Sequence, residues 1–212
     1  MLLASAYFPP VEYFALLARD FIPGTPAGDT SIYIEACEHF VKQSWRTRCT
    51  ILGPNGTETL QVPIVHDGAR TLREIRVEYA TPWIVRTQRA LDAAYQSSPF
   101  FEHYADGIFA ILDSQPETLL ELNTALTRHI LQRLGIGVQL QLTQEYVPEG
   151  SVPDDYRSVL HPKRKNNVLR ELGLDRPYYQ VFARKHAFTP GLSILDLLFN
   201  EGPDALLYLK RQ

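Results

Sequence analysis

Acidic, basic, amide and aromatic side chains are concentrated in one segment of fourteen residues, from Glu35 to Arg48. Such groups can bind an anion and move a proton when they converge on one cavity. The sequence on both sides is β-rich, which would fix the position of the segment. We therefore predict that the site lies here. Its eight candidate residues are Glu35, Glu38, His39, Lys42, Gln43, Trp45, Arg46 and Arg48.

Two arginines suggest what this site binds. Arg46 and Arg48 are two positions apart, so in a strand leading into a hairpin they would project from one face. Two guanidinium groups side by side can hold a carboxylate or a phosphate bidentately. Glu35 or His39 would then act as the general acid or base. The chemistry indicated is group transfer on an anionic small molecule.

Further residues would complete the pocket. Tyr7, Trp45 and Tyr95 are predicted to stack on the ligand or wall the pocket, and Lys42 and Gln43 to contact it. The structural alternative is an ion-pair network on a sheet face, in which the glutamates only neutralise the arginines. Surface pairs add little stability, so the concentration of charge favours recognition if the site is concave.

Two other clusters carry weaker signals. Cys37 and His39 share a strand face, an arrangement that could activate a thiol, although a buried structural cysteine is the commoner case. The most basic stretch, residues 161–165, contains His161, Lys163, Arg164 and Lys165. It is interpreted either as a lid that contacts an anion or as a solvated loop leading into a helix.

Several familiar sites are excluded by motif. The chain has no glycine-rich dinucleotide or phosphate loop and no G-x-S-x-G elbow. His103 and His129 lack the spacing of zinc ligands, and the two cysteines, Cys37 and Cys49, make no zinc framework. No metal site is predicted, the cysteines are expected to be reduced, and no cofactor can be named.

The elements that must position the cluster start with a buried strand at Leu2–Tyr7 and a helix at Val11–Asp20. A Gly- and Pro-rich loop, Phe21–Thr30, leads to a second strand at Ile32–Ala36, where Glu35 would face a cleft. Asn55 and Gly56 between β-rich runs predict a hairpin with a type I′ turn. A further strand is predicted at Leu72–Tyr79.

The second half is predicted to be mainly helical. Proline-initiated helices are expected at residues 83–96, 101–112 and 119–134, then strands at 138–142 and 178–182. Ser193 and Asp196 have capping spacing before a short apolar helix, and Pro203 starts another. The predicted fold is α/β, a mixed sheet flanked by helices in three layers that loosely resembles nucleotide-binding folds.

Composition limits the class of protein. A chain of 212 residues with 45% hydrophobic content can form one domain, residues 1–212, with a Pro-, Gly- and Asp-rich segment near 147–177 expected to be flexible. Net charge is −3 with no long basic tract, so nucleic-acid binding is not expected. Because no signal peptide or membrane span is found, a cytoplasmic protein is predicted. The oligomeric state is left open.

Longer motifs carry a family resemblance. YFPPVEYFALL, IYIEACEHFVKQSWRTRCTI, the returning LQVPI, W…AY-x-x-S-P-F-F-E-x-Y and YYQVF…LSILDLLFNEGP resemble the WbqC-like protein family, over nearly the whole chain and most specifically in the last block. The resemblance implies a cytoplasmic bacterial protein, linked in some members to O-antigen or other surface-polysaccharide genes. A transferase activity on a nucleotide sugar or similar metabolite is the function that this favours.

The chain departs from the family pattern in places that bear on chemistry. Many members carry two aspartates after the second strand, where this chain has Glu35 and Ala36, and an Asn-Arg pair where it has Thr47 and Arg48. A histidine often found after the tryptophan is replaced by Arg86. These departures, and a shortened stretch between 147 and 178, leave a non-catalytic ligand-binding or assembly protein as the alternative.

Overall fold

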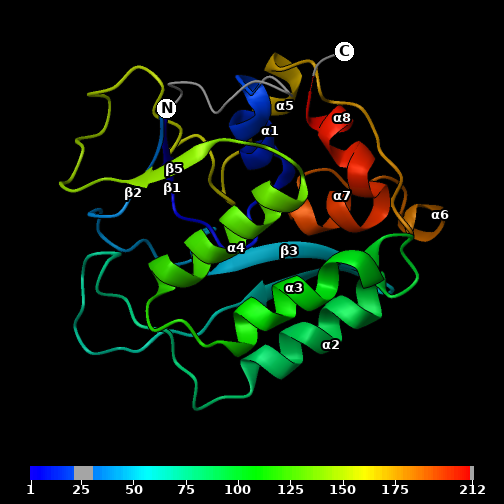
Figure 1. Cartoon of the computed structure of the whole chain (residues 1–212), viewed down its shortest axis with the longest axis horizontal. Helices are drawn as coiled ribbons and strands as arrows, with labels where there is room; N and C mark the ends of the chain where they lie inside the picture. The colour runs from blue at the N-terminus through cyan, green and yellow to red at the C-terminus, as the bar shows by residue number, and fades with distance from the viewer. Residues whose placement is uncertain (22–30, 211–212) are drawn as a thin grey trace.

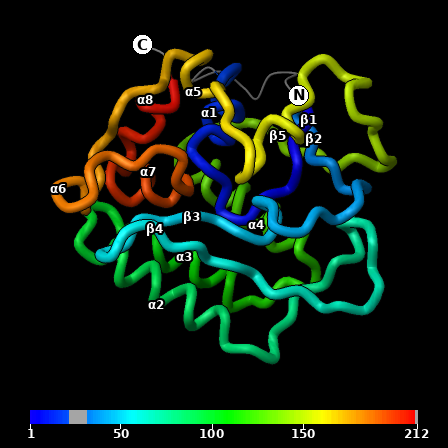
Figure 2. Tube along the Cα trace, turned by 180° about the vertical axis from the view of Figure 1, so that it is seen from behind, coloured from blue at the N-terminus to red at the C-terminus, as the bar shows by residue number. Residues whose placement is uncertain are grey.

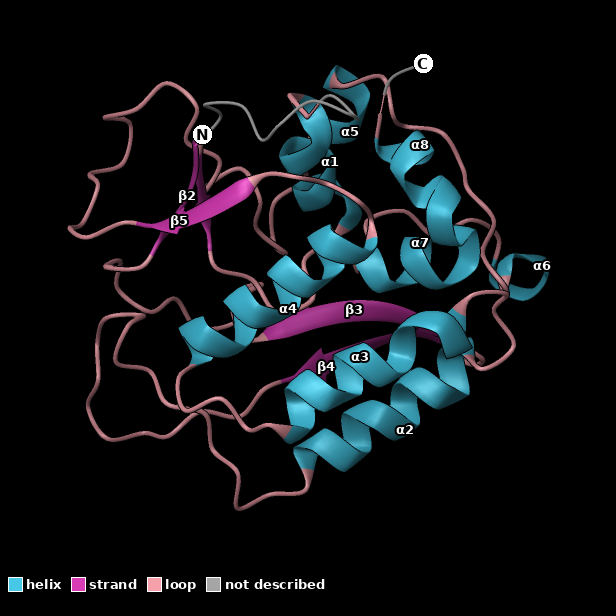
Figure 3. Cartoon of the chain, viewed as in Figure 1, coloured by secondary structure: helices cyan, strands magenta, loops and turns pink. Residues whose placement is uncertain are grey.

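The structure is a computed structural model that describes residues 1–21 and 31–210. Apart from Phe21, the predicted loop Phe21–Thr30 lies outside the described residues. Two groups of strands and the helices around them make up the fold, which confirms the α/β class. The parallel and antiparallel strands form two separate sheets, with α4 running between them in the view of Figure 3.

The first sheet is parallel and has the order β1-β2-β5. Its strands are β1 (Leu2–Ala4), β2 (Ser31–Glu35) and β5 (Gln139–Leu142), and α1 (Val11–Arg19) makes the crossover from β1. Ile32 and Ile34 of β2 are buried and Tyr33 between them is exposed, whereas Glu35, at the end of the strand, is buried as well. The carboxyl ends of the three strands share one edge of the sheet.

The segment after β5 returns to this sheet. The N–H of Leu2 donates to the carbonyl of Asp154 at 2.8 Å, and the N–H of Tyr156 donates to the carbonyl of Leu2 at 2.9 Å. The stretch predicted as a linker therefore runs beside β1 around Asp154. This contact brings the residues after position 156 back toward the sheet.

The predicted hairpin is present as β3 (Arg48–Gly53) and β4 (Gly56–Gln61). Gly53 pairs with Gly56, so Pro54 and Asn55 are the two central residues and Gly56 carries the positive φ, 109°. The type I′ prediction is wrong, because a type I′ turn needs a positive φ at both central residues. Proline fixes φ at about −65°, so Pro54 can occupy the first central position only of a turn with negative φ there.

Three long helices follow within a residue or two of their predicted bounds. They are α2 (Trp83–Tyr95), α3 (Phe101–Asp113) and α4 (Leu119–Arg133). Seen from behind, β3 and β4 lie across the front of α2 and α3 (Figure 2). A capping box starts α4, where Thr118 and Glu121 each bond the other's backbone N–H. The Thr-x-x-Glu signal for it is in the sequence.

The C-terminal helices are α5 (Val168–Glu171), α6 (Ala183–His186), α7 (Ile194–Glu201), the 3₁₀ turn η1 (Gly202–Asp204) and α8 (Ala205–Leu209). Of these, α5, α7 and α8 contact α1, whereas α6 lies apart from it (Figure 1). The predicted N-cap of α7 is confirmed, because the Ser193 hydroxyl accepts a hydrogen bond from the N–H of Leu195.

Two predicted strands are wrong. Residues 72–79 make isolated bridges only, Ile64 with Val77 and Arg76 with Thr118, although Leu72, Ile75 and Val77 are buried. Residues 178–182 lead into α6 without strand pairing. Apolar alternation marks burial here, but a strand also needs a neighbour to complete its hydrogen bonds.

Candidate functional site

A pocket of about 680 Å³ opens at the carboxyl edge of the parallel sheet. One wall follows β2 directly, a second follows β5, and the third comes from residues 157–164. Open parallel sheets bind ligands at this edge. The side chains that carry charge or an imidazole at the pocket are Glu38, His39, Arg46, Glu149, Arg157, His161 and Arg164.

Arg46 and Glu38 form a buried, bidentate ion pair. Nε of Arg46 lies 2.7 Å from Oε1 of Glu38, and Nη2 lies 2.6 Å from Oε2, with only 6% and 10% of the side chains exposed. Asn123 on α4 holds the arginine backbone by donating to its carbonyl at 2.8 Å. The pair uses two of the guanidinium nitrogens, which leaves Nη1 for a ligand.

Arg157 is held by two carboxylates. Its Nε donates to Asp155 at 2.9 Å, and its Nη1 donates to Glu35 at 3.2 Å. Hydrogen bonds from this guanidinium lower the pKa of Asp155. Glu35 also accepts hydrogen bonds from the N–H of Cys37, the hydroxyl of Thr143 and the N–H of Val147, at 2.8 to 2.9 Å. The arginine side chain is thus fixed from behind.

Arg164 and His161 lie together in the lining. Arg164 donates to the carbonyl of Ser158 at 3.1 Å and has no carboxylate partner among the described residues. Partial burial, then the positive charges of Arg164, Arg46 and Lys163, lower the pKa of His161. The neutral ring accepts a hydrogen bond on Nδ1 from the N–H of Lys163 at 3.2 Å. Its proton therefore lies on Nε2, where it can be donated.

Two further contacts tie the walls together. Nζ of Lys163 donates to the side-chain oxygen of Gln43 at 2.7 Å, which joins the basic stretch to the segment after β2. Gln43 has a φ of 56°, a conformation that non-glycine residues adopt at some cost. Nε of Arg73, which is not a lining residue, lies 3.4 Å from the sulfur of Cys37. The position of Arg73 was not foreseen from the sequence.

The structure brings some of the predicted site residues together and separates others. Arg46 and His39 line the pocket. Glu35, predicted to face a cleft, is fully buried behind Arg157, because four donors surround its carboxylate. Arg48 is not a lining residue. Arg46 lies in the turn before β3, so the two arginines do not share a strand face.

The remaining predicted ligand contacts lie elsewhere. Tyr7 and Tyr95 are completely buried in the hydrophobic core, and burial raises the pKa of both hydroxyls. Trp45 is half-buried against that core, and its carbonyl accepts a hydrogen bond from the N–H of Tyr7 at 2.8 Å. Lys42 is exposed beside the pocket rather than in its lining, as is Gln43.

Arg157 is the functional candidate that sequence reasoning missed. It follows the Pro-, Gly- and Asp-rich stretch interpreted as a linker, and its contact with Glu35 joins residues 122 positions apart. A charged Asp154-Asp155-Tyr156-Arg157 run inside a supposed linker was the available signal. His161 and Arg164 had been noted as a basic stretch, but nothing in the sequence placed them opposite His39.

A second, more apolar pocket of about 830 Å³ adjoins the first. Tyr146 lines both, and the Arg157 guanidinium carbon lies 5.9 Å from the centre of its ring. The neighbouring walls include Tyr33, Pro148, Val152 and Pro153. A ligand could therefore place a charged group in the first pocket and an apolar or planar group in the second.

In residues 1–21 and 31–210, no three His, Cys, Asp or Glu side chains are grouped as they would be around a metal ion. Within the same ranges, no helix has both the length and the apolar character to cross a bilayer.

Comparisons with known proteins give a family and one curated relative. A model of the WbqC-like protein family matches residues 5–169. The match therefore does not include the C-terminal block YYQVF…LSILDLLFNEGP, the most specific part of the resemblance in the sequence. Uncharacterized protein Rv1507c of Mycobacterium tuberculosis is 28% identical over 236 residues, covering 97% of this chain and 95% of the relative. No solved structure matches this chain.

Proposed function

The chain belongs to the WbqC-like protein family, and from this premise we propose that it is a group-transfer enzyme acting on an anionic metabolite of the nucleotide-sugar type. The observation that carries the proposal is the convergence of three guanidinium groups and two imidazoles on one pocket. Phosphate oxygens are the groups that forked, planar guanidinium donors bind best.

The local field supports an anion despite the carboxylates nearby. Glu38 neutralises Arg46, and Asp155 and Glu35 neutralise Arg157, so these two arginines contribute geometry more than net charge. Arg164 forms no ion pair with a carboxylate among the described residues, so its positive charge is available to a ligand, although Glu149 also belongs to the lining. Partial burial, and after it the positive charges of Arg164, Arg46 and Lys163, lower the pKa of His161, so three cations lie near this ring.

The proposal gives the lining residues separate tasks. Arg164, Arg46 and the Nε2–H of His161 bind the phosphates, and Tyr146 leads to the neighbouring pocket, which holds the uncharged part of the ligand. His39 takes the proton of an acceptor hydroxyl as the acceptor oxygen forms a bond to the sugar carbon of the ligand, while the bond from that carbon to the phosphate oxygen breaks and the phosphate leaves with the electrons of that bond. Glu35 is a positioning residue that orients Arg157.

A binding protein without catalysis is the second candidate. It is favoured by the engagement of Glu38, Glu35 and Asp155 with arginines, because none of these carboxylates is then free to act as a base. In that case the same pocket would hold the anion and His39 would have no chemical task.

A nucleotide-sugar panel with product detection separates the two candidates. Arg164→Ala should weaken binding about tenfold to a hundredfold, as expected for loss of a charge-assisted hydrogen bond. Arg89→Ala, an exposed arginine on α2, is the matched control and should change nothing. His39→Ala should abolish turnover and leave binding intact. Binding without product throughout the panel favours the second candidate, and equal affinities in the two arginine variants refute the anion site.

A further inference from the structure

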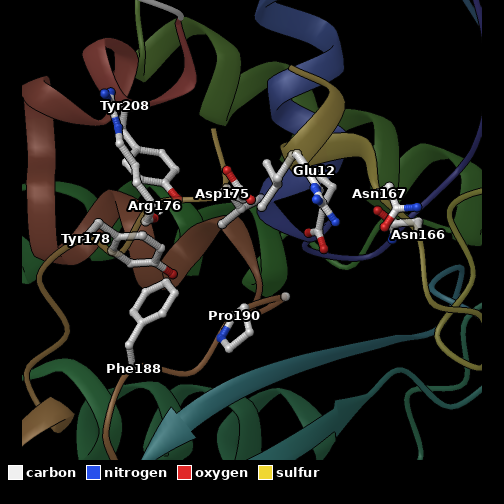
Figure 4. A pocket seen from close by; sticks show the side chains of 13 residues that line it. Glu12, Asn166, Asn167, Asp175, Arg176, Tyr178, Phe188, Pro190 and Tyr208 are labelled. Carbon is white, nitrogen blue, oxygen red and sulfur yellow. Dashed lines mark hydrogen bonds between the residues drawn. The ribbon is translucent and has the colours of Figure 1, made fainter. Parts of the chain in front are cut away.

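A third pocket, of about 450 Å³, lies between α1, α5 and residues 175–191 (Figure 4). It shares no lining residue with the anion pocket. Most of its wall lies beyond residue 169, where the family match ends. The family match therefore says little about this part of the wall. The volume of the pocket is in the range of small-molecule sites.

Glu12 stands on one side of the pocket. It is the second residue of α1, and its Oε2 is buried without a hydrogen-bond partner among the described residues. No arginine, lysine or histidine in the described ranges forms an ion pair with it. Burial raises the pKa of this carboxyl. A buried carboxylate oxygen with no donor is costly, so it marks a position where a donor from a ligand would be strongly favoured.

Three aromatic rings stand on the opposite side, as Figure 4 shows. Tyr178 packs edge-on against Phe188 and Tyr208, with ring centres 5.3 and 5.1 Å apart. Both tyrosine hydroxyls already have hydrogen-bond partners, that of Tyr178 with Asp196 at 2.8 Å and that of Tyr208 with the carbonyls of Leu174 and Arg176. The rings therefore offer the pocket an apolar, π-rich surface.

The other charged residues of the lining are exposed. Asp175, Arg170 and Arg176 are open to water, which screens them. Arg176 lies over the Tyr208 ring and donates to the carbonyl of Leu207. The least screened charge is thus the negative one of Glu12. A carboxylate opposite an aromatic wall is the arrangement that recognises organic ammonium groups.

We propose that this pocket is a second binding site, specific for a small organic amine whose ammonium group binds Glu12 and whose apolar or aromatic body packs against Tyr178, Phe188 and Tyr208. The site is independent of the anion pocket, and its occupant is a separate ligand.

Titration with 2-phenylethylammonium, followed by calorimetry, tests the proposal on the full chain. 3-Phenylpropionate, with a carboxylate in place of the ammonium, and neutral 2-phenylethanol are the comparison ligands. The ammonium ligand should bind at least tenfold more tightly than either. Arg164→Ala should leave this binding unchanged, which keeps the result separate from that of the anion site.

Glu12→Gln keeps the size of the side chain and removes its charge, and should weaken ammonium binding tenfold or more. Glu102→Gln is the matched control, because Glu102 is also the second residue of its helix, α3, but is exposed to solvent. Urea unfolding of both variants checks that they are folded. Absence of ammonium binding to the wild type, equal affinity in Glu12→Gln, or tighter binding of the carboxylate ligand overturns the proposal.

Discussion

Removal of one partner from the buried Arg46–Glu38 pair should destabilise the whole protein. Arg46→Met keeps the length of the side chain but leaves the Glu38 carboxylate buried, with 10% of its side chain exposed and no cation against it. Breaking such a pair costs about 3–5 kcal/mol. For a chain of this size that corresponds to a fall in Tm of roughly 6–20 °C. Urea unfolding at pH 7 measures it.

A double-mutant cycle identifies the cause. Arg46→Met combined with Glu38→Leu removes both charges, and should recover about 2 kcal/mol or more relative to the sum of the single changes. The exposed pair Arg76–Asp67, 2.8 Å apart, is the control and should show little or no coupling. If Arg46→Met costs less than about 1 kcal/mol, or if the cycle is additive, the pair does not hold the pocket wall and the reasoning fails.

Three smaller predictions follow from single side chains. Burial raises the pKa of Asp196 to about 6, so the folded state binds this proton more tightly than the unfolded chain. The free energy of unfolding must then fall as the pH rises from about 4 to about 6. Urea unfolding should show the difference in this free energy between the wild type and Asp196→Asn shrinking by about 3 kcal/mol over that range. Gly202→Ala should cost more than about 1 kcal/mol, because φ is 54° and the new Cβ would lie 2.5 Å from the Phe100 ring; an unchanged Tm contradicts this. Thr118→Ala removes the capping box with Glu121 and should cost about 1 kcal/mol in the same measurement, and no loss would show that the cap is dispensable.

The anion pocket is organised by carboxylates that lie behind its cations. Glu35 has no exposed surface, yet it fixes Arg157, and Glu38 does the same for Arg46. Preorganised donors lose little freedom when a ligand binds. Glu35 and Glu38 are thus compatible with the proposed binding of an anion, because each is engaged with an arginine, whereas Glu149 in the same lining is not.

Local sequence determined the three long helices and the hairpin, and it pointed to a segment that supplies part of the pocket lining. The bounds of α2, α3 and α4 were predictable because apolar spacing, a proline just before each helix and, for α4, the capping box act over a few positions. His39 and Arg46 were likewise identified from their own segment. Hydrogen bonds within a helix join neighbours in sequence, so such elements need little information from elsewhere.

Tertiary structure alone decided which charged groups meet. Arg46 faces the pocket and Arg48 does not because β3 begins only at Arg48, a boundary set by pairing with β4. Glu35 is buried because Arg157, 122 positions away, is brought against it when residues 154–156 bond to β1. Strand pairing and ion pairs join residues distant in the chain, and their partners cannot be read from the alternation or charge of one segment.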